Sequence, residues 1–135
     1  MSRRLDVGLL DTSVVIDLEA LLPEDLPKQI SICAITMAEL AAGPAATQDP
    51  AQRAKRQDRL QRAEAVFEPI PFTTEAARAY GRVYSATKQA GRSPRPRLAD
   101  LLIASVAIAE GLPLITRNPD DFKGLDGLLE VCALP

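Results

Sequence analysis

The sequence predicts an α/β fold, a sandwich in which helices cover a mainly parallel central sheet. Short apolar runs alternate with longer segments of helical periodicity, which is the pattern of parallel strands joined by helical crossovers. Of the residues, 47% are hydrophobic, so a buried core can form. The length of 135 residues fits one domain spanning residues 1–135, because a second core would have too few residues.

The first half of the chain predicts two strand–helix pairs and a third helix. Residues 7–10 form a short apolar run ending at Asp11, and the apolar positions that follow indicate a sharp turn and a helix. Residues 30–35 are expected to form the second strand, and the next helix opens at Thr36 and ends near Gly43. A helix with a broad basic face is expected over residues 52–67.

The second half predicts three strands and two helices. Residues 68–72 read as a short strand bounded by prolines, and a helix is expected from Thr73 to Gly91. Residues 92–97 are too rich in proline to be helical, whereas residues 98–110 are apolar almost all round, as in a buried helix. Strands are expected at 112–116 and 129–134. Cys33 and Cys132 read as small buried residues on strands, so a disulfide scaffold is not expected.

Composition excludes several classes of chemistry. The chain has no histidine, so catalytic triads and paired-histidine ribonuclease mechanisms cannot be built from it. Its net charge of −2 argues weakly against a nucleic-acid partner, and local patches must decide. The N-terminus has no apolar signal region and no segment approaches a membrane span, so we expect a cytoplasmic protein without membrane attachment.

Acidic or amide side chains follow the predicted strands at the positions where a functional crevice forms. In a parallel sheet this crevice lies outside the carboxyl ends of the strands. One acid follows the first strand, one lies in the helix after the second, one opens the buried helix, and an amide with two acids follows the strand that ends at Thr116. These residues are Asp11, Glu39, Asp100, and Asn118 with Asp120 and Asp121.

Each acid also has a purely structural interpretation, which is favoured when that acid is taken alone. Asp11 fits the N-cap of the next helix. Thr36 and Glu39 match a capping box, T-x-x-E. Asp100 fits a first-turn acid that interacts with the helix dipole, and the acids after Pro119 fit a turn.

The acids taken together favour a metal site. Asp100 is followed by Leu101, Leu102, Ile103 and Ala104, so its helix has no broad solvated face. Burying an unpaired charge costs several kcal/mol or forces protonation. A divalent cation shared by several carboxylates relieves that cost, and hard cations such as Mg²⁺ bind oxygen ligands and substrate phosphates. This arrangement suits cleavage of phosphodiester bonds.

Four ordered blocks resemble PIN domains, in particular the VapC toxins of VapBC toxin–antitoxin pairs. The blocks are Leu9–Ile16, Ile35–Leu40, Asp100–Ala104 and Leu114–Phe122. The resemblance implies a PIN-like three-layer α/β/α sandwich and a Mg²⁺- or Mn²⁺-dependent endoribonuclease toxin. The partners it implies are an RNA substrate, a cognate VapB-type antitoxin, and a second copy in a homodimer or a toxin–antitoxin hetero-oligomer.

The resemblance also implies roles for individual residues. Asp11 and Asp100 are expected metal ligands, and Glu39 completes the acidic triad directly or through water. Many family members have an acid at the position of Asn118, so either Asn118 binds a water or phosphate, or Asp121 substitutes as the fourth acid. Thr12 and Thr116 resemble hydroxyl residues that orient the carboxylates, with plain turn and cap roles as an equal alternative.

Substrate binding is expected at the arginines of the proline-rich loop. Arg92, Arg95 and Arg97 lie just before Asp100, and Arg suits bidentate phosphate contacts. The basic face of helix 52–67 is the second choice, and a solvated loop or helix face is the alternative in each case. Hydrolysis by an activated water needs no attack by the ribose 2′-hydroxyl, so the expected products carry 5′-phosphate and 3′-hydroxyl ends.

Two rival functions remain open at this point. An aspartate-based phosphotransferase or receiver domain also places acids at strand ends, but the haloacid-dehalogenase pattern wants an acid where this chain has Ser13. A non-catalytic binding module on a PIN scaffold is the second rival.

Overall fold

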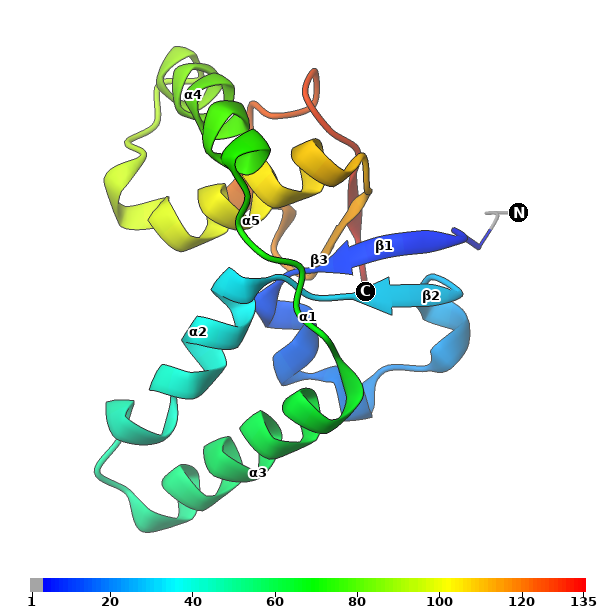
Figure 1. Ribbon diagram of the computed structural model, residues 1–135, viewed down its shortest axis with the longest axis vertical. Coiled ribbons are helices and arrows are strands. Elements are labelled where there is room, and N and C mark those ends of the chain that lie inside the picture. Colours follow the sequence, from blue (N-terminus) through cyan, green and yellow to red (C-terminus); the bar gives the residue numbers. More distant parts are fainter. Residues whose placement is uncertain (1–3) are drawn as a thin grey trace.

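The computed structural model describes residues 4–135 and contains a parallel sheet of four strands (Figure 1). The strands are β1 (Val7–Leu10), β2 (Gln29–Ser31), β3 (Leu114–Thr116) and β4 (Val131–Ala133). Their order across the sheet is β2-β1-β3-β4, and each pair of neighbours runs parallel. The predicted mainly parallel sheet is confirmed.

Helices cover both faces of this sheet. Neighbouring strand residues point to opposite faces. Leu9 and Leu114 therefore pack with α4 (Thr74–Gln89) and α5 (Leu98–Glu110), and Leu10 and Ile115 pack on the other face. That second core also contains residues of α1 (Thr12–Ile16), α2 (Ala34–Ala42) and α3 (Pro50–Val66). Figure 1 shows α4 and α5 on one side of the strands and α1, α2 and α3 on the other, which confirms the three-layer sandwich.

The helix over residues 98–110 is buried, as its sequence predicts. Leu101 and residues 103–107 of α5 are buried between α4 and the sheet. The helix ends at Gly111, whose φ of +67 is a left-handed conformation that glycine adopts at low cost. The ends of α3 and α4 lie within two residues of the predicted ranges. None of the helices described between residues 4 and 135 combines the length and apolar character needed to span a bilayer.

The segment around Cys33 differs from the prediction of a strand over residues 30–35. β2 ends at Ser31, and Cys33 is both the N-cap of α2 and the partner of Ile70 in an isolated bridge. Residues 68–72 form only this bridge, with Ile70 N–H donating to Ile32 at 2.9 Å and Ala34 N–H donating to Ile70 at 2.8 Å. Pro69 and Pro71 flank Ile70 and lack the N–H groups that a longer ladder requires.

The two cysteines are free and only one is fully buried. Cys33 is buried but lies at a helix cap, so its expected place on a strand is wrong. Cys132 does lie on a strand, β4, but is only partly buried because β4 is at the edge of the sheet.

Short 3₁₀ segments connect the main elements of the described part of the chain: η1 (Leu18–Ala20), η2 (Pro23–Asp25), η3 (Pro44–Ala46), η4 (Arg95–Arg97) and η5 (Pro119–Phe122). The segment 92–97 is not α-helical, as predicted, but η4 gives it a single turn directly before α5. η5 follows β3 and is anchored by Phe122, which is 1% exposed and packs in the same core as α5. η4 and η5 therefore flank the first turn of α5.

Candidate active site

Asp11 lies at the carboxyl end of β1 and is held by several donors. Its Oδ1 accepts hydrogen bonds from Ser13 Oγ at 2.6 Å and from the Val14 N–H at 3.2 Å. Its Oδ2 accepts a short hydrogen bond from Thr116 Oγ1. The residue is 3% exposed, and burial raises its pKa while the hydrogen bonds from Ser13 and Thr116 oppose that rise. Asp11 is thus the N-cap of α1, as one interpretation predicts, but its contacts extend beyond those of a cap.

The two hydroxyl groups that bind Asp11 are themselves fixed by the chain after β3. Ser13 Oγ accepts from the Arg117 N–H at 3.2 Å, and Thr116 Oγ1 accepts from the Asn118 N–H at 2.9 Å. Because each oxygen accepts from a backbone N–H, its own proton is directed at Asp11. Both carboxylate oxygens are therefore oriented by consecutive backbone groups of one loop. Thr116 was predicted to orient the carboxylates, whereas Ser13 was given no such role, although a hydroxyl two residues after a strand-end acid is a common turn signal.

Glu39 contacts α1 and does not form the expected capping box. α2 begins at Ala34, so Thr36 lies inside the helix, and the N-cap Cys33 makes no side-chain cap bond. Glu39 Oε1 instead accepts from Thr12 Oγ1 at 2.5 Å, and the Thr12 and Thr36 hydroxyl oxygens are 3.2 Å apart. The capping-box interpretation is wrong because the helix starts two residues early, after the bridge to Ile70. The Thr12 hydroxyl connects the acid of α2 to α1.

Asp100 lies in the first turn of α5 and is half-buried. Burial and the negative charges of Asp121, Asp11 and Glu39 raise its pKa to about 6, and the positive charge of Arg97 lowers it. The order of these effects indicates that Asp121 acts on Asp100 most strongly among the acids. Four carboxylates from four separate segments thus share one electrostatic site.

The two candidates for the fourth acidic position differ in their surroundings. Asn118 is exposed, and its backbone N–H is the group that binds Thr116. Asp121, on η5, is half-buried, and its charge raises the pKa of Asp100. Its carboxylate pairs with Arg97 at 3.5 Å. Of the two, only Asp121 contributes a charge to the acidic site.

The arginines before α5 are not equivalent. Arg92 donates to the backbone oxygen of Asp120 and pairs with its carboxylate at 3.4 Å. Arg97 pairs with Asp121, and its buried Nε has no partner within residues 4–135. The solvated-loop alternative therefore does not describe Arg92 or Arg97, which connect η5 to the segment before α5. Arg95 is exposed and forms no ion pair with the described residues.

The donor set fits a hydrated hard cation. Among residues 4–135, no three acidic or cysteine side chains are grouped closely enough to enclose a metal ion. Mg²⁺ does not require such an enclosure, because it keeps several waters and binds one or two carboxylates together with substrate phosphates. Asp11, whose oxygens are fixed, and Asp100, whose ionised form is disfavoured by its neighbours, are suitable carboxylates for such an ion.

Comparison with known proteins gives consistent relationships along the whole chain. The family model described as "PIN domain" matches residues 8–128. Ribonuclease VapC5 of Mycobacterium tuberculosis is 37% identical over 134 residues, which are 97% of this chain and 96% of that protein. Ribonuclease VapC8 of the same species is 34% identical over 102 residues, or 75% of this chain and 90% of the relative.

Solved structures agree with this relationship. A toxin–antitoxin system of the VapBC family, VapBC-5 from Mycobacterium tuberculosis, contains a chain that matches with a TM-score of 0.82 and 36% identity. That match covers 96% of this chain and 99% of the other. VapBC2 from Rickettsia felis, bound to a DNA fragment from its promoter, matches with a TM-score of 0.67 and 28% identity over 91% of this chain and 96% of the other. The chain therefore belongs to the PIN-domain family and is a relative of the VapC ribonucleases.

Proposed function

We propose that the protein is a Mg²⁺- or Mn²⁺-dependent endoribonuclease that acts as the toxin of a VapBC-type pair. The observation that carries this proposal is the state of Asp100. Its pKa is raised to about 6 by burial and by the charges of Asp121, Asp11 and Glu39, which outweigh the opposing charge of Arg97, so the surroundings of Asp100 are negative on balance. A divalent cation and an RNA phosphate together complement such a site. The kinship with proteins named as ribonucleases supports RNA as the substrate.

In this proposal Asp11 and Asp100 hold the cation, and Glu39 approaches it through water. When bound, the ion would supply a positive charge for the scissile phosphate and would activate a water molecule. Ser13 and Thr116 keep the Asp11 oxygens in a fixed orientation, and Thr12 does the same for Glu39. Asp121, rather than Asn118, is the fourth acid, and Arg97 holds it beside Asp100.

A cognate VapB-type antitoxin is the proposed protein partner. Several structurally similar chains were solved within VapBC assemblies, including one bound to promoter DNA. Because the site is acidic, an antitoxin that silences it is expected to bring a basic side chain against Asp11, Glu39 and Asp100. A homodimer or a toxin–antitoxin hetero-oligomer is the proposed assembly.

The surroundings of Asp11 argue against an aspartyl-phosphate mechanism. Ser13 stands two residues after Asp11, where the haloacid-dehalogenase pattern places a second acid, and its hydroxyl donates to Asp11, so the acid that such a phosphotransferase needs is missing at that position. A non-catalytic binding module remains the second candidate, because a shared acidic site can hold a cation without turnover. Cleavage activity separates these two functions.

The test is cleavage of a fluorescent single-stranded RNA by the purified protein with Mg²⁺, Mn²⁺ or excess EDTA. We expect cleavage with either cation, none with EDTA, and products that carry 5′-phosphate and 3′-hydroxyl ends. Arg78→Ala is a matched control for preparation and folding, because Arg78 lies on the exposed face of α4 and, among residues 4–135, pairs with Glu75 alone. Cation-independent cleavage, or products with 2′,3′-cyclic phosphate ends, would contradict the proposal.

A further inference from the structure

A groove of about 310 Å³ opens beside Thr12 and Glu39 and extends between α2 and α3. One end is formed by residues of the acidic site, and the wall opposite belongs to α3. Polar side chains dominate this wall, and the groove is lined mainly by Thr12, Ile16, Glu39, Gln52, Arg56 and Arg59. A molecule bound at the acids can therefore continue directly into this groove.

The wall formed by α3 is positively charged in a chain that is negatively charged overall. α3 carries five basic and two acidic residues, whereas the whole chain has a net charge of −2. Within residues 4–135, neither Arg56 nor Arg59 forms an ion pair with an acidic side chain. One Arg56 nitrogen donates to the Gly43 carbonyl at 3.0 Å, which fixes the side chain without neutralising its charge.

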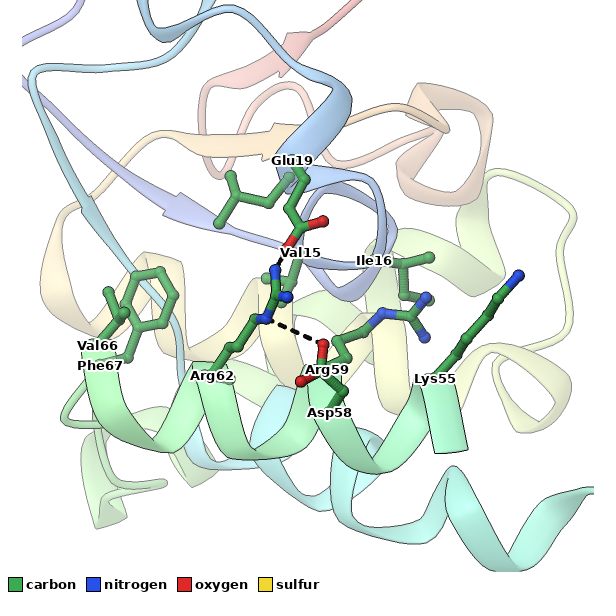
Figure 2. A pocket seen from close by; sticks show the side chains of 11 residues that line it. Val15, Ile16, Glu19, Lys55, Asp58, Arg59, Arg62, Val66 and Phe67 are labelled. Atoms are coloured by element: carbon green, nitrogen blue, oxygen red, sulfur yellow. Dashed lines mark ion pairs between the residues drawn. The ribbon is translucent and has the colours of Figure 1, made fainter. Parts of the chain in front are cut away.

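The same wall continues into a second groove of about 460 Å³, which shares Ile16 and Arg59 with the first. Figure 2 shows Arg59 and Arg62 extending from α3 toward the segment that carries Ile16 and Glu19, whereas Lys55 of the same helix points away from both. Arg62 is tied to Asp58 at 2.9 Å and to Glu19, as the dashed lines mark. Unlike Arg62, Arg56 and Arg59 line the groove beside Glu39 without an acidic partner among residues 4–135.

We propose that the groove between α2 and α3 is a subsite for single-stranded RNA on one side of the scissile bond, with Arg56 and Arg59 binding its phosphates. This inference rests on the proposed ribonuclease function. Carboxylates repel a polyanion, so an RNA strand at Glu39 and Asp100 needs nearby cations to hold its flanking phosphates. Arg92 and Arg97 are engaged by Asp120 and Asp121. A guanidinium group can donate two parallel hydrogen bonds to one phosphate. Arg56 and Arg59 are half-buried, so solvent screens their positive charges less than those of fully exposed arginines.

The experiment measures binding without cleavage. In an Asp100→Asn background, fluorescence anisotropy follows a labelled mixed-sequence single-stranded RNA across a range of KCl concentrations. For Arg56→Ala with Arg59→Ala we expect weaker binding and a salt dependence that falls by about 1.4 log units of Kd per log unit of salt, for two lost phosphate contacts. Replacement of both by Lys keeps the charges and should restore most of the slope.

The matched control is Arg78→Ala with Arg82→Ala, which removes the same charge from the exposed surface of α4. Equal salt slopes in the two alanine pairs would overturn the proposal, and so would an effect of Arg56 and Arg59 on antitoxin binding but not on RNA binding. Failure of the proposed function gives a different result, because the wild-type protein would then not cleave RNA with Mn²⁺ at any salt concentration.

Discussion

Asp11, in the turn after β1, and Asp100, at the start of α5, differ in the groups that surround their carboxylates. Asp11 is 3% exposed and accepts hydrogen bonds from two hydroxyl groups and one backbone N–H. Asp100 accepts no hydrogen bond from residues 4–135, and burial together with the charges of Asp121, Asp11 and Glu39 raises its pKa to about 6. The fold thus orients one carboxylate by hydrogen bonds, whereas the charge of Arg97 beside the other does not offset its burial and its acidic neighbours.

This difference indicates separate roles for the two residues in binding a cation. Hydrogen bonds to a charged group contribute about 1.5–3 kcal/mol each, so the hydrogen bonds to Asp11 fix one orientation and offset part of the burial that raises its pKa. Asp100 has no such support, and its neighbours favour protonation. A ligand that brings positive charge therefore relieves the repulsion at Asp100, while Asp11, whose pKa burial also raises, supplies a fixed point of attachment.

The largest expected effect comes from neutralising Asp100. Asp100→Asn should abolish RNA cleavage while RNA binding is kept or strengthened, because the change removes a cation ligand and one charge that repels phosphate. A fluorescent RNA cleavage assay with Mn²⁺ measures the rate, and anisotropy measures binding. Glu110→Gln at the exposed end of the same helix is the matched control. A variant that cleaves at half the wild-type rate or faster would remove Asp100 from the site.

Stabilisation by the cation is the next largest effect. At a hundredfold excess of Mn²⁺ over its dissociation constant, linkage predicts about 2.7 kcal/mol of added stability, a rise in Tm on the order of 10 °C. Thermal melts in EDTA and in excess Mn²⁺ measure this shift. Asp11→Ala and Asp100→Asn should lose most of it, and Glu110→Gln should keep it. An equal shift in all four proteins would assign the effect to nonspecific binding.

Loss of the Ser13 hydroxyl tests how much the hydrogen bonds to Asp11 stabilise the fold. Ser13→Ala removes one donor to Asp11 and should lower the free energy of unfolding of the metal-free protein by about 1.5–3 kcal/mol. Ser13→Thr keeps the hydroxyl and should restore much of the lost free energy of unfolding. Asp100→Asn should do the reverse and leave the metal-free protein as stable or more stable, since it removes repulsion. Urea unfolding in EDTA compares the three variants, and equal losses in Ser13→Ala and Asp100→Asn would erase the distinction between the two aspartates.

The sequence predicted the layers and the acids because both follow from local patterns. Alternating apolar runs and helical periodicity specify strands and helices, and acids at strand ends meet at one edge of a parallel sheet. The start of α2 was misplaced, because the bridge between Cys33 and Ile70 is a long-range contact that no local pattern reports. The capping-box interpretation of Glu39 failed for the same reason.

Residue roles that depend on tertiary contacts were the hardest to predict. Ser13 acquires its role only when the loop after β3 brings the Arg117 N–H to its oxygen, across 104 positions of sequence. The choice between Asn118 and Asp121 depends on how η5 folds, and Phe122 sets this by packing into the core. Arg92 and Arg97 looked free in the sequence, but the acids of η5 bind them.

The smallest expected effect is a dependence of the stability of the metal-free protein on pH, and it tests the raised pKa of Asp100. The pKa of Asp100 is raised from 3.8 to about 6 by burial and by the charges of Asp121, Asp11 and Glu39. Between these values the folded protein binds more protons than the unfolded chain, so stability falls as pH rises. The stability that protonated Asp100 contributes is fully present below pH 3.8, the pKa of an ordinary aspartate, and it is lost once the pH passes about 6.

Because Asp100 is only half-buried, solvent screens part of this effect. Urea midpoints in EDTA at a series of pH values from about 4 to about 7 measure the dependence, and wild-type protein is compared with Asp100→Asn and Glu110→Gln. Other carboxylates titrate in the same range, so the informative quantity is the difference between proteins. Asp100→Asn should gain relative to wild type as pH rises through 6, and Glu110→Gln should not. Parallel curves for wild type and Asp100→Asn would mean that Asp100 has an ordinary pKa, and the case for an uncompensated acid that attracts a cation would lose its electrostatic support.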